Sequence, residues 1–149
     1  MMEKLAQTKV GTGGIAGLQK GENASTKYCY NKNKVTSHSD IAGIVGYLNA
    51  GSVENCYNIG QVETYQSQFV INMGGICGRS LSGTSVKNCY TLESLNLEAV
   101  GLPEENTVDS LTKKESESNM KSDTFVGTIN SGKSNFKKGT EYPLLSWQK

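Results

Sequence analysis

The sequence predicts an all-β fold, a parallel β-solenoid of about three coils closed by a small C-terminal cap of helix and strand. Two repeated motifs and the composition predict it. A Gly-Ile motif occurs three times, with Gly14, Gly43 and Gly75 spaced by 29 and 32 residues. A Cys-Tyr motif follows each copy at a nearly constant distance. The 17 Gly, 2 Pro and 36% hydrophobic residues are typical of short strands joined by tight turns.

The three copies are imperfect repeats of a unit of about thirty residues. The first motif occupies residues 13–17, 42–46 and 74–78, and the second occupies 29–31, 55–58 and 88–91. Each copy has too few apolar side chains to bury a face alone, so the copies are expected to stack with equivalent positions about 4.8 Å apart. The expected inward-facing ladders are Ile15, Ile44 and Ile76; Thr26, Val53 and Val86; and Val35, Val62 and Leu95.

The cysteines follow the repeat. Cys29, Cys56 and Cys89 occupy one repeat position and are expected to form a column on neighbouring coils, whereas Cys77 belongs to another strand. The chain has no Cys-x-x-Cys pair, and its only histidine, His38, lies in a polar turn, so no metal site is predicted. Free, buried thiols that pack as small hydrophobic side chains are favoured, and disulfides between adjacent coils are the alternative.

Asparagines recur at the turns of the repeat. Asn31 and Asn58 are expected to form a second structural ladder, because a side-chain amide at a turn can hydrogen-bond to the coil above or below. Asn55 and Asn88 suit turn positions of the same kind.

A column of tyrosines is the one repeated feature with a binding interpretation. Tyr30, Tyr57 and Tyr90 follow the three repeated cysteines. If the column faces outward, it forms an aromatic strip that can stack on sugar rings or on a partner protein; if it faces inward, it belongs to the core. The turn at each asparagine obscures the alternation of the strand, so the sequence leaves both orientations open.

Residues 1–97 are interpreted as the repeats, and residues 98–149 as a loop, a helical cap and a closing strand within one structural unit. The acidic segment 98–109 contains Pro103 and is expected to leave the stack as a loop. Residues 112–115 form a capping-box pattern that predicts the start of a short helix. The apolar face of the following helix is expected to be Met120, Phe125, Val126 and Ile129, ending at residues 130–132. Residues 142–147 are expected to return as a strand that carries Trp147 into the end of the core.

The charge balance and hydropathy exclude several functional classes. Fifteen basic and fourteen acidic residues leave a formal charge of +1, so no long-range field favours nucleic acid. No stretch approaches the roughly eighteen apolar residues of a membrane span, and no membrane insertion is predicted. Residues 1–10 contain no apolar run suited to a signal peptide, and a fragment of a larger exported protein would share this feature.

Two patterns resemble catalytic or cofactor motifs without their required context. Residues 10–17 satisfy a dinucleotide-binding fingerprint, but the same Gly-Ile-x-Gly returns twice and no helix is predicted after it. Ser37, His38 and Asp40 are the residue types of a hydrolytic triad, yet a triad needs geometry that converges from separate elements. The chain is therefore predicted to have no catalytic residues and no cofactor.

The repeats resemble the GLUG-type repeat, which reads roughly Gly-Gly-Ile-Val-Gly and then Val-x-Asn-Cys-Tyr-Asn-x-Gly-x-Val. Residues 42–46 and 53–62 follow this pattern almost throughout, whereas Tyr28 and Thr91 replace its asparagines in the first and third copies. Residues 142–147 also look like the tail of such arrays. The resemblance implies an exported bacterial protein, found at the cell surface or secreted, in the company of adhesin-like chains and immunoglobulin-A-cleaving metalloproteases. It implies no activity for the repeat itself.

These expectations combine into a non-catalytic repeat module of an adhesin-like bacterial protein, which serves as a stalk or as a binding surface for a host protein or glycan. The alternative is an accessory domain that positions substrate for a secreted hydrolase, either a protease of the immunoglobulin-A type or a carbohydrate-active enzyme. A third expectation is self-association through the open edge of the N-terminal coil.

Overall fold

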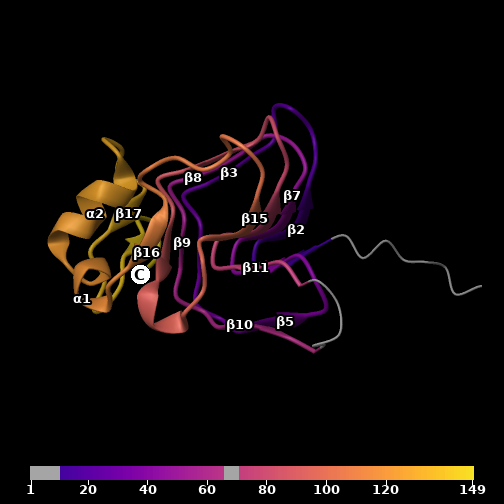
Figure 1. Ribbon diagram of the computed structural model, residues 1–149. Coiled ribbons are helices and arrows are strands. Elements are labelled where there is room, and N and C mark those ends of the chain that lie inside the picture. The colour runs from indigo at the N-terminus through magenta and orange to yellow at the C-terminus, as the bar shows by residue number, and fades with distance from the viewer. Residues whose placement is uncertain (1–10, 66–70) are drawn as a thin grey trace, which may run out of the picture.

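The computed structural model describes residues 11–65 and 71–149. The first ten residues, where no signal peptide is predicted, lie outside these ranges. The described chain is mostly β, and all but one of its sheets are parallel, which confirms the predicted all-β class. Successive segments of the chain lie over one another as layers, with the C-terminal helices to one side (Figure 1).

Each layer is a set of short strands separated by turns. The first layer contains β1 (Thr12–Gly13), β2 (Ala16–Gln19), β3 (Ser25–Lys27), β4 (Tyr30–Asn31) and β5 (Val35–Ser37). The second contains β6 (Ile41–Ala42), β7 (Val45–Leu48), β8 (Ser52–Glu54), β9 (Tyr57–Asn58) and β10 (Val62–Thr64). The third contains β11 (Met73–Gly74), β12 (Cys77–Ser80), β13 (Ser85–Lys87) and β14 (Tyr90–Leu92).

Strands pair between layers, and equivalent residues of the repeat meet. Parallel ladders join β2, β7 and β12, then β3, β8 and β13, then β4, β9 and β14. In the second of these ladders Thr26 pairs with Val53, and Val53 pairs with Val86. The strands β1, β6 and β11 form a further ladder, and β5 pairs with β10. The backbone register therefore follows the spacing of the repeated motifs.

A fourth layer continues the stack, so the predicted loop over residues 98–109 is wrong. The strand β15 (Val100–Pro103) pairs in parallel with β12, and Val108 forms a parallel bridge with Val86. The predicted helix start at residues 112–115 is also wrong, because β16 (Lys113–Glu115) pairs with β14. Backbone hydrogen bonds hold this layer, and they do not require the repeat's side chains.

A hydrophobic core lies inside the layers. It contains Ile44, Val53, Val86 and the cysteines Cys56, Cys77 and Cys89, with Ala99 and Val100 from the fourth layer. In the Ile ladder, Ile44 and Ile76 are fully buried, whereas Ile15 in the first layer is 46% exposed. A second small cluster joins Val35, Ile41 and Val62. Leu95, expected beside Val62, ends the short 3-10 helix η1 (Glu93–Leu95) and packs, partly buried, against this cluster.

The C-terminal segment covers the side of the stack rather than its end (Figure 1). It contains α1 (Glu117–Met120), α2 (Asp123–Asn130), β17 (Phe136–Lys137) and β18 (Leu144–Leu145). The side chains of Ser116 and Ser122 cap the two helices by accepting hydrogen bonds from Asn119 N and Phe125 N. The predicted burial of Trp147 is wrong: β18 pairs antiparallel with β17, the chain turns after Leu145, and Trp147 is 78% exposed.

Candidate functional site

The tyrosine column faces away from the inner core but is not free on the surface. Tyr30 pairs with Tyr57, and Tyr57 with Tyr90, along β4, β9 and β14. The cysteine before each tyrosine points inward, so the tyrosine points outward, because side chains alternate along a strand. Tyr57 and Tyr90 are then covered by the C-terminal segment and retain exposures of 0% and 2%. Neither residue can act as the exposed aromatic strip.

The cover over the tyrosines is aromatic and apolar. The ring of Phe125 from α2 makes edge contacts with both Tyr57 and Tyr90, at centroid distances of 6.0 and 5.2 Å. Met120 and Ile129 complete the same buried cluster. Burial raises the pKa of Tyr57 far above its ordinary value and raises the pKa of Tyr90 to about 12. Both phenols therefore remain neutral at physiological pH.

Tyr30 is the member of the column that stays partly accessible. Its ring stacks on the ring of Tyr57 with a centroid distance of 5.1 Å and an interplanar angle of 5°. Its hydroxyl is hydrogen-bonded to the side chain of Gln148 near the C-terminus. Of the predicted aromatic strip, only Tyr30 in the first layer therefore remains partly accessible.

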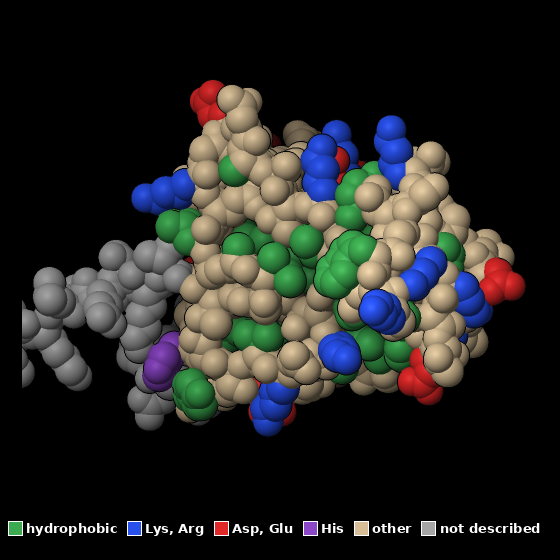
Figure 2. All heavy atoms as spheres, turned by 180° about the vertical axis from the view of Figure 1, so that it is seen from behind, with side chains coloured by type: hydrophobic (Ala, Val, Ile, Leu, Met, Phe, Trp, Pro, Cys, Tyr) green, Lys and Arg blue, Asp and Glu red, His purple; other side chains and the backbone are tan. Residues whose placement is uncertain are grey.

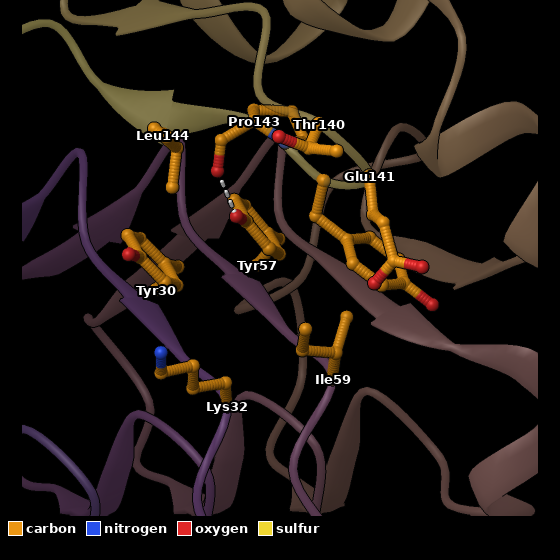
Figure 3. A pocket seen from close by; sticks show the side chains of 9 residues that line it. Tyr30, Lys32, Tyr57, Ile59, Thr140, Glu141, Pro143 and Leu144 are labelled. Carbon is orange, nitrogen blue, oxygen red and sulfur yellow. Dashed lines mark hydrogen bonds between the residues drawn. The ribbon is translucent and has the colours of Figure 1, made fainter. Parts of the chain in front are cut away.

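A cavity of about 270 Å³ lies beside Tyr30 and is a candidate binding site (Figure 3). We call it the tyrosine groove. Its walls come from the first two layers and from the tail, and its lining residues are Tyr30, Lys32, Tyr57, Ile59, Thr140, Glu141, Tyr142, Pro143 and Leu144. The hydroxyl of Tyr57 donates a hydrogen bond to the carbonyl of Pro143, which fixes the tail against the layers.

Charged groups of both signs stand at the groove. Lys32 is exposed and has no ion pair among the described residues. Glu141 lies 3.8 Å from Lys121, and the ammonium of Lys121 also stands 5.2 Å from the ring centroid of Tyr142. An aromatic wall with a cation and a carboxylate nearby suits a ligand that has both apolar faces and polar substituents.

The repeated asparagines have two different roles. Asn31 Nδ2 donates to Asn58 Oδ1 at 2.9 Å, so these two amides form a ladder between layers. The ladder ends at Thr91, whose buried hydroxyl has no hydrogen-bond partner in the part of the chain that the structure describes. Asn55 and Asn88 instead adopt positive φ values of 55° and 49°.

Asn55 and Asn88 also bind the last turn of α2. The amide of Asn55 donates to the carbonyl of Ile129 at 2.9 Å, and that of Asn88 donates to the carbonyl of Thr128 at 2.8 Å. Carbonyls in the last turn of a helix have no partner within the helix, so the repeat supplies the missing donors. Tyr28 takes the same position in the first layer, with φ 52°, and its ring packs against Phe136.

All four cysteines are free thiols. Cys56, Cys77 and Cys89 are fully buried, and Cys29 is partly buried. Burial raises the pKa of Cys56 and of Cys77, while the neighbouring Cys56 thiol, and then burial, raise the pKa of Cys29. These three thiols stay protonated at physiological pH and are poor nucleophiles.

Ser37, His38 and Asp40 do not assemble a triad among the described residues. Ser37 Oγ accepts a hydrogen bond from Thr12 at 2.8 Å, and Asp40 accepts one from Asn72 at 2.6 Å. The buried Nδ1 of His38 has no hydrogen-bond partner within residues 11–65 and 71–149. After the glycines of the dinucleotide-like pattern the chain forms β2 rather than a helix, and Val10 of that pattern lies outside the described residues.

Within residues 11–65 and 71–149, His, Cys, Asp and Glu side chains do not gather in groups of three or more that could hold a metal ion. No helix in the described part of the chain has the length and apolar character needed to cross a membrane. Comparison with protein-family models, with curated proteins and with solved structures gave no match.

Sequence reasoning missed the tyrosine groove. Lys32 shows no distinctive pattern in the sequence, and Glu141 and Tyr142 lie about 110 residues away from it. Two patterns gave a signal. The tyrosine column, if it faces outward, predicted an aromatic strip that includes Tyr30 and Tyr57, and the aromatic character of residues 142–147 predicted a closing strand rather than a wall of a cavity.

Proposed function

We propose that this chain is a non-catalytic β-solenoid module of an adhesin-like bacterial protein, in which the layers are coils and the stack serves as a rigid stalk or binding surface. The observation that carries the proposal is the register of the strands. Equivalent residues from successive repeats pair directly, as Tyr30, Tyr57 and Tyr90 do. Such a stack grows in one direction and presents long, regular side faces.

Contacts between layers support the stalk role. Besides the backbone ladders, the amides of Asn31 and Asn58 are hydrogen-bonded and the rings of Tyr30 and Tyr57 are stacked. The C-terminal segment binds the second and third layers through Asn55 and Asn88. Since each layer contacts mainly its neighbours, rigidity depends on these interfaces.

Hydrogen exchange tests the stalk role. Amides in β7, β8 and β9 of the second layer should exchange together with those in β12, β13 and β14 of the third, through a single unfolding event. A second layer that opens alone, while the third stays protected, would contradict a rigid stack.

Location is proposed from the resemblance to GLUG-type repeats, which occur on exported bacterial proteins. Antibodies raised against this chain should label intact cells of the source bacterium or detect the protein in its culture medium. Detection only after cell lysis would rule out a surface or secreted location.

The tyrosine groove favours a second candidate, an accessory domain that holds a substrate for a secreted hydrolase. Tyr30 and Tyr142 offer ring surface, and Lys32 offers an unpaired cation for polar substituents. Glycan-array and pull-down screens should show binding that Tyr30→Ala and Tyr142→Ala abolish. The control is Tyr65→Ala, which removes a 68% exposed tyrosine that does not line the groove. Equal loss in all three variants would show that the groove is not the binding site.

A further inference from the structure

The two ends of the stack are chemically different. At one end, β1, β2, β3, β4 and β5 each form the edge of a sheet, so within the described part of the chain a complete layer presents unpaired backbone groups. We call this end the N-face. At the other end, which we call the C-face, β15, Val108 and β16 form the last layer. The C-terminal helices lie beside the stack, so they do not cover this end (Figure 1).

The N-face combines an apolar centre with a basic margin. Figure 2 views the molecule from this side and shows hydrophobic side chains in the middle, with Lys and Arg side chains and some Asp and Glu side chains around them. Ile15, 46% exposed, and Cys29 line a hollow on this face. Residues 12–37 contain four lysines and one glutamate, which gives a formal charge of +3. Lys20 and Lys32 have no ion pair among the described residues.

The C-face has the complementary features. Residues 98–115 contain five carboxylates and two lysines, a formal charge of −3. The pairing of Cys77 with Val100 places Ala99 in the column of Ile44 and Ile76. This small side chain lines a hollow of about 320 Å³ together with Val100, Pro103 and Val108. The exposed Ile15 on the N-face thus lies in the same column as the Ala99 hollow on the C-face.

We propose that the N-face of one copy of this chain stacks on the C-face of a second copy, head to tail, in the register of the existing layers. The register predicts the contacts. Ile15 would lie over Ala99, and Leu18 over Leu102, because each pair shares a column. Leu102 is 43% exposed, so the contact buries apolar surface from both copies.

The same register places three lysines over three carboxylates. Gln19, Leu48, Ser80 and Pro103 share a column, so the next column places Lys20 over Glu104. In the same way, the bridge from Val86 to Val108 places Lys27 over Asp109. The pairing of Leu92 with Glu115 places Lys32 over Glu115.

An ion pair of this geometry already exists inside the stack. Lys27 and Glu54 are register partners in adjacent layers, and their charged atoms lie 3.3 Å apart. The contact between copies would repeat that arrangement. Because the two faces differ, the interface is heterologous and leaves an N-face and a C-face free at the ends, so association continues beyond the dimer.

Sedimentation velocity of the complete chain over a concentration series tests the proposal. The average sedimentation coefficient should rise past the value of a dimer, and raising the salt from about 0.05 M to about 0.5 M should reduce the association. A monomer at every concentration would overturn the proposal. A species that stops at a dimer would indicate that two N-faces pair with each other, and would overturn it too.

Charge-reversal variants locate the interface. Lys32→Glu and Glu115→Lys should each weaken association about tenfold. A mixture of the two variants should associate more strongly than either alone, because Glu at position 32 then meets Lys at position 115. The matched control is Lys133→Glu, an exposed lysine in the turn after α2. Equal weakening by the control, or no recovery in the mixture, would refute this interface whether or not the stalk role holds.

Ile15→Asp provides a test that does not depend on charge pairing. Ile15 is partly exposed, so the variant should fold with an unchanged circular dichroism spectrum and should still lose association. Wild-type association in a folded Ile15→Asp protein would exclude the N-face as the contact.

Discussion

Gly43 lies directly against the side chain of Asn58 in the same layer. A Cβ built on Gly43 would overlap Oδ1 of Asn58 and would lie 2.6 Å from the carbonyl oxygen of Gly75 in the next layer. Gly14 and Gly75 meet Asn31 and Thr91 in the same way. The repeated glycines thus make room for the amide ladder and for the close approach of the layers.

Gly43→Ala should therefore lower the free energy of unfolding by about 3 kcal/mol, because backbone and buried amide atoms cannot both move aside. Gly127→Ala is the matched control: it lies in α2, and apart from its chain neighbours and the backbone of α2 itself, no atom of the described residues lies within 4 Å of its Cβ position. The control should stabilise the protein by about 0.5–1 kcal/mol. Urea unfolding measures both. Similar effects of the two substitutions would contradict the close packing at Gly43.

Asn55→Ala should lower the free energy of unfolding by about 2 kcal/mol, because it removes the hydrogen bond to Ile129 and disfavours the positive φ. Asn55→Gly keeps the backbone conformation and should lower it by about 1 kcal/mol. Asn106→Ala is the control, since Asn106 is exposed and has φ 59°. If Asn55→Ala has no larger effect than Asn106→Ala, the bond to α2 does not stabilise the fold.

Stability should fall as the pH rises above about 9. Burial raises the pKa values of Cys56, Cys77, Tyr57 and Tyr90. The unfolded chain loses these protons at a lower pH than the folded chain does. The contribution of these groups to the free energy of unfolding is therefore complete below their unfolded pKa values. It declines as the pH rises towards 12, the pKa of Tyr90 in the folded chain. Urea midpoints measured from pH 7 to pH 11 should show the decline. Tyr90→Phe should make it shallower, and a flat profile would contradict the burial of these groups.

One thiol, Cys29, should react with a water-soluble disulfide reagent in the folded protein ahead of the others, because it is accessible, although its raised pKa slows the reaction. Cys29 is partly buried, whereas Cys56, Cys77 and Cys89 are fully buried. The remaining three should react only as fast as the protein unfolds, because the reagent cannot reach a fully buried thiol. Cys29→Ser should remove the fast phase. Two or more fast thiols would show that the inner core is open.

The sequence predicts the first three layers well, because the motifs that identify the repeat are the residues that set its register. Identical residues at equivalent positions, such as Tyr57 and Tyr90, pair on neighbouring strands. The sequence does not predict the fourth layer, because this layer lacks the Gly-Ile and Cys-Tyr motifs. Val100 and Val108 nevertheless pair with residues of the third layer. Parallel pairing uses backbone N–H and C=O groups, so a strand can join the sheet without the side chains of the repeat.

The wrong predictions for residues 112–115 and for Trp147 have local structural causes. Thr112 and Glu115 match a capping box, but the hydroxyl of Thr112 is hydrogen-bonded to Asp109, and Glu115 accepts from the amide of Ser116. Trp147 lies on the surface because the turn after β18 directs it away from the layers. The tyrosine groove depends on a contact between Tyr57 and the tail across 86 residues, and single-sequence patterns carry no information on such contacts.

The attachment of α2 to Asn55 and Asn88 limits how this architecture can lengthen during evolution. The helix is tied to the second and third layers, and a duplicated repeat inserted between them would pull its two anchor points apart. Duplication before Tyr28 would leave both anchors in place, because Tyr28 offers no amide to the helix. The gene can therefore gain repeats at the amino-terminal side while its carboxyl-terminal segment is inherited unchanged.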